Sequence, residues 1–164
     1  FPPINFNQIE KDIYRSGSPT VFNHEFIKNL QLNTLIALSH DSIDDNLLEF
    51  LEDNSVRVII VPDIVNDGFH VSQELVFEAL KYLTCSKFYP IMIISRNGTN
   101  ITGVVTGCLR KLQRWSLISI FEEYRRFSGS KMQQHYEQFI ELFDTDLVQL
   151  SNEAPSFLSI MLDI

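Results

Sequence analysis

The sequence is poor in several features that define other classes of protein. It holds only two cysteines, Cys85 and Cys108, and Cys108 falls in an apolar helical pattern. A disulfide framework is therefore not expected, and a reducing, cytoplasmic location fits best. No apolar run approaches the ~20 residues of a membrane span. No signal peptide, repeat or low-complexity tract is visible, although Phe1 in place of Met indicates a trimmed chain.

Basic residues are also scarce. The chain has 13 Lys and Arg against 21 Asp and Glu, which gives a formal net charge of −8. An acidic surface repels nucleic acid and anionic membranes, so we expect neither as a partner. It also opposes a highly phosphorylated ligand unless basic groups gather in one pocket. Local basic clusters do occur, at Arg110-Lys111, Arg114 and Arg125-Arg126.

The composition that remains is that of a globular domain. The 164 residues are 45% hydrophobic and 21% charged, which suits a single domain over residues 1–164 with its own core. Residues 1–10 include Pro2-Pro3 and predict an extended arm. Residues 145–164 predict a C-terminal tail in which Phe157, Leu158 and Met161 either pack on the same domain or dock a partner.

Hydrophobic patterns predict alternating strands and helices. Short apolar runs predict strands at 12–15, 34–38, 57–61 and 91–94, the last of them central. Helices are expected after the cap candidates Asn23, Asp41 or Asp44, Ser72 and Ser116. Further helices are expected after residue 103 and around 132–143, with Cys108 and Trp115 in the core. The order indicates an α/β fold with a small, mostly parallel sheet flanked by helices.

The segment 94–103 is the candidate functional loop, because it joins a buried strand to a helix start. In α/β sheets, ligands bind outside the carboxyl ends of the strands. A helix N-terminus presents free N–H groups and the positive end of the helix dipole, which suits phosphate. Gly98 permits backbone geometry that other residues resist.

The sequence resembles the fungal and plant atypical dual-specificity phosphatases of the oxidant-induced cell-cycle-arrest type. Their active relatives remove phosphate from diphosphoinositols. The resemblance covers nearly the whole chain. Among the members of the family, the sequence is most similar to a catalytically degenerate fungal paralogue. It implies a protein-tyrosine-phosphatase-like fold. The motifs that carry it are Ile13-Tyr14-Arg15-Ser16-Gly17, Thr102-Gly103, Leu109-Arg110-Lys111-Leu112-Gln113 and Glu123-Tyr124-Arg125-Arg126-Phe127.

Active members of that family carry a loop of the form HCxxGxxRTG. On this template Ile94 takes the His place, Ser95 the Cys place and Ile101 the Arg place. A serine hydroxyl is far less acidic than a thiol at a helix N-terminus, so Ser95 would need a general base. The histidines are scattered in sequence, and none lies near Ser95. Ile101 offers no donor to a phosphate group, whereas arginine offers a planar fork.

These replacements favour a catalytically inactive protein, not an enzyme, that acts as a binding or scaffolding subunit in a complex with paralogous phosphatases. Two alternatives stay open. One is a weak or unconventional phosphatase that uses Ser95 on diphosphoinositols or phosphoproteins. The other is a non-catalytic sensor of a phosphorylated small molecule such as an inositol phosphate. No cofactor or metal is expected.

The expected site residues lie mostly in the loop. Asp63 or Asp67 would be a vestigial general acid, although a turn role is the simpler interpretation of both. Arg96 is expected to be a solvated surface charge, and Arg15 to tie loops together. The positions expected to contact a ligand are Ser95, Arg96, Asn97, Gly98, Thr99, Asn100, Ile101, Thr102 and Lys131.

Overall fold

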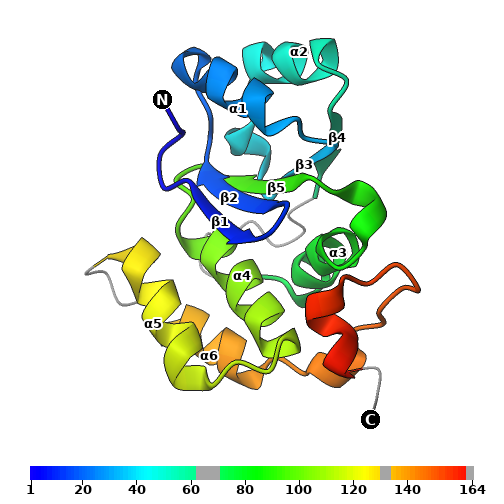
Figure 1. The fold of residues 1–164 in the computed structure, drawn as a ribbon. Helices are drawn as coiled ribbons and strands as arrows, with labels where there is room; N and C mark the ends of the chain where they lie inside the picture. The colour runs from blue at the N-terminus through cyan, green and yellow to red at the C-terminus, as the bar shows by residue number, and fades with distance from the viewer. Residues whose placement is uncertain (62–70, 130–133, 162–164) are drawn as a thin grey trace.

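The computed structural model describes residues 1–61, 71–129 and 134–161. Asp63, Asp67 and Lys131, named above as candidate site residues, lie outside the described residues. The part of the chain that is described holds a five-stranded sheet with helices on both faces (Figure 1). Its strands are β1 (Asn7–Glu10), β2 (Ile13–Gly17), β3 (Thr34–Ala37), β4 (Arg57–Ile60) and β5 (Ile91–Ser95).

The sheet has the strand order β1-β2-β5-β3-β4, so β5 is central, as predicted. β5 pairs in parallel with β2 and with β3, and β3 pairs in parallel with β4. Only β1 is antiparallel, to β2. The predicted small, mostly parallel sheet is confirmed. The arm expected over residues 1–10 contains β1, an edge strand of three polar residues and the buried Ile9, which give no clear alternation.

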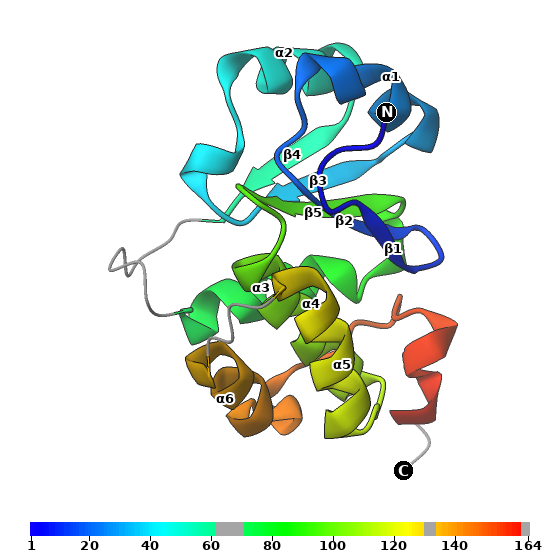
Figure 2. The same ribbon diagram turned by 90° about the vertical axis from the view of Figure 1, so that its left-hand side faces the viewer.

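Helices cover the two faces unequally (Figure 2). On one face lie α1 (His24–Leu30) and α2 (Asp45–Asp53), and on the other α3 (Gln73–Leu83), α4 (Asn100–Leu112), α5 (Leu117–Ser128) and α6 (Gln134–Leu142). Short 3-10 turns are η1 (Val21–Asn23), η2 (His40–Ser42), η3 (Ser86–Phe88), η4 (Thr145–Leu147) and η5 (Ser156–Met161).

The alternation of side chains along the strands explains these two layers. Residues i and i+2 of a strand point to the same face. Leu35 and Ala37 of β3 therefore join Met92 and Ile94 of β5 in the core under α1 and α2. The intervening Ile36 faces the opposite core, with Ile91 and Ile93 of β5 and Val105, Cys108 and Leu109 of α4.

Helix starts follow the predicted caps with one exception. The side chains of Asp44, Ser72 and Ser116 accept hydrogen bonds from backbone N–H groups of the first turns of α2, α3 and α5. Asn23 does not cap α1 with its side chain. Its amide instead donates to the carbonyl oxygens of Phe1 and Pro2 and so holds the N-terminal segment in place.

Part of the C-terminal tail packs on the core, whereas Trp115 does not lie in the core as expected. Leu158 of the tail is fully buried in the core beside α3 and α4, and Phe157 packs against the same cluster, so this part of the tail packs on its own fold. Trp115 was expected in the core, but it is 37% exposed. Its ring lies under the Arg110 guanidinium at 4.0 Å, so it covers a buried charge instead of filling an apolar gap.

Candidate functional site

The candidate loop leaves the carboxyl end of the central strand and enters α4. Ser95 is the last residue of β5, and its partner on β2 is Gly17. A cavity of about 410 Å³ opens at this point. Its described lining comes from the loop, from the segment after β3 and from α6, namely Ser39, His40, Asp41, Ser95, Arg96, Asn97, Thr99, Asn100, Ile101 and Tyr136.

Six of the residues expected to contact a ligand therefore line one cavity. Gly98 forms part of the loop behind this lining, and Thr102 is fully buried in the first turn of α4. Arg96 is exposed as expected, and its guanidinium lies 3.9 Å from the Asp41 carboxylate. That pair sits in solvent, so it contributes little to stability.

Three successive carbonyl groups of the loop are held by the N-terminal part of the chain. The Arg96 carbonyl oxygen accepts from the Ser18 N–H at 3.2 Å. The Asn97 oxygen accepts from Asn5 Nδ2 at 2.7 Å. The Gly98 oxygen accepts from Arg15 Nη2 at 3.1 Å. The role of Arg15 in tying loops together is thus confirmed.

This arrangement fixes where the loop N–H groups point. In a planar trans peptide the C=O of one residue and the N–H of the next point in opposite directions. With the carbonyls of 96, 97 and 98 directed at the N-terminal segment, the N–H groups of Asn97, Gly98 and Thr99 face the other way. The Gly98 N–H accordingly donates to Ser95 Oγ at 3.1 Å. A row of N–H groups next to a helix N-terminus is a site for an anion.

Gly98 is required for this geometry. Its φ is +72°, in the left-handed region that favours glycine. A Cβ placed on it would lie 2.3 Å from the Gly17 nitrogen and 2.6 Å from the Ser16 carbonyl carbon. The loop backbone thus packs directly on the end of β2, and no larger residue fits there without moving one of the two segments.

Ser95 Oγ is held by two polar groups. Besides the Gly98 N–H, it forms a hydrogen bond of 2.7 Å with Thr102 Oγ1. The Thr102 backbone carbonyl in turn accepts from the Thr106 hydroxyl at 2.8 Å. Groups that hydrogen-bond an anion favour the ionised form of that group. The Ser95 oxygen thus has two contacts that can stabilise negative charge on it.

Sequence analysis missed His40 and Asp41 as neighbours of Ser95. β3 and β5 are parallel neighbours, and the Leu38 N–H donates to the Ile94 carbonyl at 2.9 Å. The residues after β3 therefore emerge at the same edge of the sheet as the loop. The signal was available, because the carboxyl ends of parallel strands meet at one edge. The site thus contains an imidazole and a carboxylate as well as the serine.

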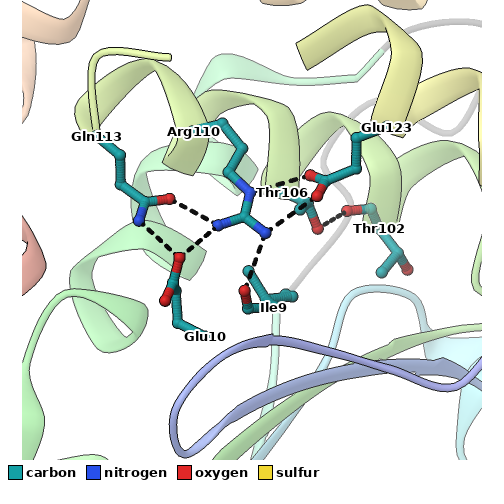
Figure 3. A network of polar contacts seen from close by, with 7 residues as sticks. All are labelled: Ile9, Glu10, Thr102, Thr106, Arg110, Gln113 and Glu123. Atoms are coloured by element: carbon teal, nitrogen blue, oxygen red, sulfur yellow. Dashed lines mark hydrogen bonds and ion pairs between the residues drawn. The ribbon is translucent and has the colours of Figure 1, made fainter. Parts of the chain in front are cut away.

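The basic cluster at Arg110 has a structural role away from this cavity. Arg110 donates to both carboxylate oxygens of Glu123 at 3.0 Å, to Glu10 at 2.7 Å and to the Ile9 carbonyl at 2.9 Å (Figure 3). Gln113 joins the same network through Arg110 and Glu10. These contacts connect β1 and α5 to the C-terminal end of α4.

The other candidate groups lie outside the cavity lining. Cys85 is buried before η3, where its Sγ lies 3.4 Å from Glu153 Oε2. Cys108 is fully buried in α4, and burial raises the pKa of its thiol. Within the described ranges, no group of three or more His, Cys, Asp or Glu is placed to hold a metal ion. No helix there is long and apolar enough to cross a membrane.

Comparison with known proteins agrees with this architecture. The family model described as "Tyrosine phosphatase family" matches residues 1–161. "Probable tyrosine-protein phosphatase DG1060" of Dictyostelium discoideum is 46% identical over 96% of this chain and 95% of its own length. "Putative tyrosine-protein phosphatase OCA1" of Saccharomyces cerevisiae is 38% identical over 96% of this chain and 69% of its own length.

Solved structures give the same answer. The Siw14 catalytic core superposes with a TM-score of 0.84 at 35% identity, over 89% of this chain and 88% of that chain. A second structure, of the core catalytic domain of the S. cerevisiae PP-IP phosphatase SIW14 with citrate, gives 0.83. The Pseudomonas aeruginosa protein TpbA, at 21% identity and a TM-score of 0.72, shares the fold.

The expectation of a catalytically inactive scaffolding subunit is contradicted by these findings. It depended on Ser95 and Ile101 standing where active relatives have cysteine and arginine. The chain nevertheless matches, over nearly all of its length, proteins named as phosphatases and the catalytic core of one of them. The loop also keeps an ordered backbone and an open cavity, so it is not a collapsed remnant. An active phosphatase fits better, and this chain belongs to the tyrosine phosphatase family.

Proposed function

We propose that this chain is an unconventional phosphatase, which uses Ser95 in place of the usual cysteine to release phosphate from a diphosphoinositol. The structural likeness to a PP-IP phosphatase at 35% identity supports this substrate class. The names of the relatives support a phosphoprotein as the alternative. We place the activity in the cytoplasm, because both cysteines are free and buried, as suits a reducing compartment.

The observation that carries the proposal is the orientation of the loop. Its three carbonyls are bonded to the N-terminal segment, and its N–H groups face the side of Ser95. Preorganised N–H donors stabilise the charge that develops on a phosphoryl group without having to rearrange during the reaction. The first turn of α4 adds the positive end of a 13-residue helix.

Ser95 needs a proton acceptor, and His40 is the candidate in the same cavity. Histidine is the side chain that most often performs general acid–base catalysis. Once His40 has taken that proton, it is also the candidate proton donor to the leaving group, because the Asp41 carboxylate in the same lining is paired with Arg96. The Gly98 N–H and the Thr102 hydroxyl stabilise the Ser95 oxygen as it loses its proton.

The reaction then has two steps. In the first step the Ser95 oxygen attacks phosphorus and its proton passes to His40, and the bond between phosphorus and the leaving oxygen breaks as His40 gives that proton to the leaving oxygen. In the second step a water molecule gives a proton to His40 and its oxygen attacks the phosphorus of the phosphoserine, and the bond between phosphorus and the Ser95 oxygen breaks as His40 returns a proton to that oxygen. Inorganic phosphate leaves and Ser95 recovers its hydroxyl. The sum is one water consumed and one phosphate released.

The expected rate is low. Ile101 lines the cavity but gives no donor to the phosphate oxygens. Loss of one such stabilising group typically lowers the rate by about 10²–10³-fold. The serine adds a further loss, since it must be deprotonated during the attack and a thiolate need not be.

The test is phosphate release by the purified protein and by Ser95→Ala, with a diphosphoinositol and a phosphotyrosine peptide as separate substrates. We expect slow release that Ser95→Ala abolishes, with the diphosphoinositol preferred. His40→Ala should lower the rate without changing thermal stability. Release that is equal in wild type and Ser95→Ala would rule out the proposed site, and a preference for the peptide would select the alternative substrate.

A further inference from the structure

Arg15 is an unusual side chain, a fully buried guanidinium without a direct ion pair among the described residues. It is 1% exposed and lies near the end of β2. Its Nη2 donates to the Gly98 carbonyl, and its guanidinium carbon stacks 4.1 Å from the centre of the Phe127 ring. Its Nε and Nη1 have no hydrogen-bond partner within the described part of the chain. A buried charge left in this state is costly.

The charge of Arg15 is not neutralised by the carboxylate that acts on it most strongly. Glu123 raises the pKa of Arg15, but both of its oxygens are already bonded to Arg110 (Figure 3). Burial has the larger effect and lowers the pKa of Arg15 to about 10. The guanidinium therefore stays charged at neutral pH.

The position of Arg15 relates it to the anion site. Gly98 C=O, to which it donates, belongs to the same peptide unit as the Thr99 N–H, and Thr99 lines the cavity. Arg15 Nη2 would also lie 3.7 Å from a Cβ added to Gly103 in the first turn of α4. The guanidinium thus lies directly behind the loop and the helix start. Hydrogen bonds in a low-dielectric interior polarise one another, so a charged donor at the carbonyl strengthens the N–H at the other end.

We propose that the Arg15 guanidinium, which lies behind the loop, attracts bound phosphate with its positive charge. Ile101, which lies in the loop itself, has no charge with which to do so. The inference depends on the proposed function, because it assumes that the loop binds phosphate. Arg15 does not touch the ligand, so it is a positioning residue that acts through the peptide unit of Gly98 and Thr99. This assignment also gives a reason for keeping a buried charge of which two nitrogens have no hydrogen-bond partner among the described residues.

The size of the effect follows from elementary electrostatics. Two unit charges about 10 Å apart, at an effective dielectric constant of about 20, attract strongly enough to change a dissociation constant by roughly tenfold. The pair Arg15→Lys and Arg15→Gln separates charge from hydrogen bonding, since lysine keeps the charge and glutamine keeps only a donor for Gly98. Arg57→Gln is the matched control, because exposed Arg57 begins β4 at the end of the sheet away from the cavity.

The experiment is calorimetric titration of the whole chain with inorganic phosphate. We expect Arg15→Gln to weaken binding about tenfold, Arg15→Lys to stay closer to wild type, and Arg57→Gln to bind as wild type. Equal binding by wild type and Arg15→Gln would overturn the inference, and so would equal weakening in the lysine and glutamine variants. If Arg15→Gln does not fold, Arg15→Met, which leaves no buried donor unpaired, decides in its place.

The two proposals fail in different ways in this experiment. A wild type that neither binds phosphate nor releases it from any substrate contradicts both. If the wild type releases phosphate, and the Arg15→Met variant binds phosphate as tightly as the wild type does, only the assignment of Arg15 is contradicted. Thermal melting of each variant accompanies the titration, because a loss of binding counts only in a folded protein.

Discussion

Replacing Gly98 with alanine tests whether the close approach of the loop to β2 sets the site. The new methyl group would meet backbone atoms of Ser16 and Gly17 at 2.3–2.9 Å, and backbone atoms cannot swing aside. An alanine at positive φ costs about 1–3 kcal/mol. Overpacking against a rigid neighbour adds about 1–3 kcal/mol. We therefore expect a loss of about 2–6 kcal/mol in the free energy of unfolding.

Gly129 provides the matched control. Its φ is +71°, almost the same as that of Gly98, but an added Cβ there would meet no atom of the described residues within 4 Å. Gly129→Ala should therefore cost only the conformational part, about 1–3 kcal/mol. For a domain of 164 residues each kcal/mol lowers the melting temperature by about 2–4 °C. Gly98→Ala should therefore melt at least ~2 °C below Gly129→Ala.

Activity separates the two variants more sharply. Relief of the clash at Gly98 requires the loop to move away from β2. That movement would break the bonds from Asn5 and Arg15 to the loop carbonyls and turn the N–H groups away from Ser95. Thermal melting and phosphate release, measured side by side, should show both properties lost in Gly98→Ala and activity retained in Gly129→Ala. Equal melting and equal activity of the two variants would refute the reasoning.

Three further predictions concern the rest of the fold. Arg110→Ala leaves the Glu123 carboxylate buried and unpaired, so the melting temperature should fall by about 6–20 °C. Gln113→Ala should change the melting temperature little, and similar shifts in both variants would contradict the network. Leu158→Ala should cost about 2–5 kcal/mol by denaturant unfolding, and no loss would show that the tail is not part of the core. Burial raises the pKa of Cys108, so its thiolate should be absent at pH 8 and a thiol reagent should label it only after unfolding; rapid labelling of native protein would contradict the packing.

Much of the fold could be predicted from local patterns. The buried strands around Ile36 and Ile93 are short apolar runs, and the caps Ser72 and Ser116 precede clear helical periods. β1 could not be predicted in this way. It is a short edge strand with a break in register between Gln8 and Glu10, and it gains its place by pairing with β2.

The environment of the site was harder to predict, because its contacts join distant parts of the chain. Asn5 and Arg15 reach the loop across 92 and 83 residues, and no local pattern encodes such bonds. Arg110 appears in the sequence only as part of a local basic cluster, yet its partner Glu10 lies 100 residues away. Its burial depends on the fold bringing β1 beside α4. His40, by contrast, could have been predicted from the shared edge of parallel strands.

Association with paralogous phosphatases remains a prediction. The burial of Leu158 makes this part of the tail structural, so Phe157→Ala, which touches the same core, is expected to lower stability as well as any partner binding. Co-purification of that variant with its paralogues, compared with its melting temperature, separates the two effects. Retention of every partner by a less stable variant would place the interface elsewhere.

The most direct test of the account is to look for the phosphoryl group on Ser95 during turnover. Wild-type protein mixed with a diphosphoinositol is quenched in acid, and its intact mass and peptides are measured. We predict a transient gain of one phosphoryl group, located on the peptide that contains Ser95 and absent from Ser95→Ala. Phosphate release without any phosphoserine, or with the group on another residue, would contradict the central claim that Ser95 is the nucleophile of this site.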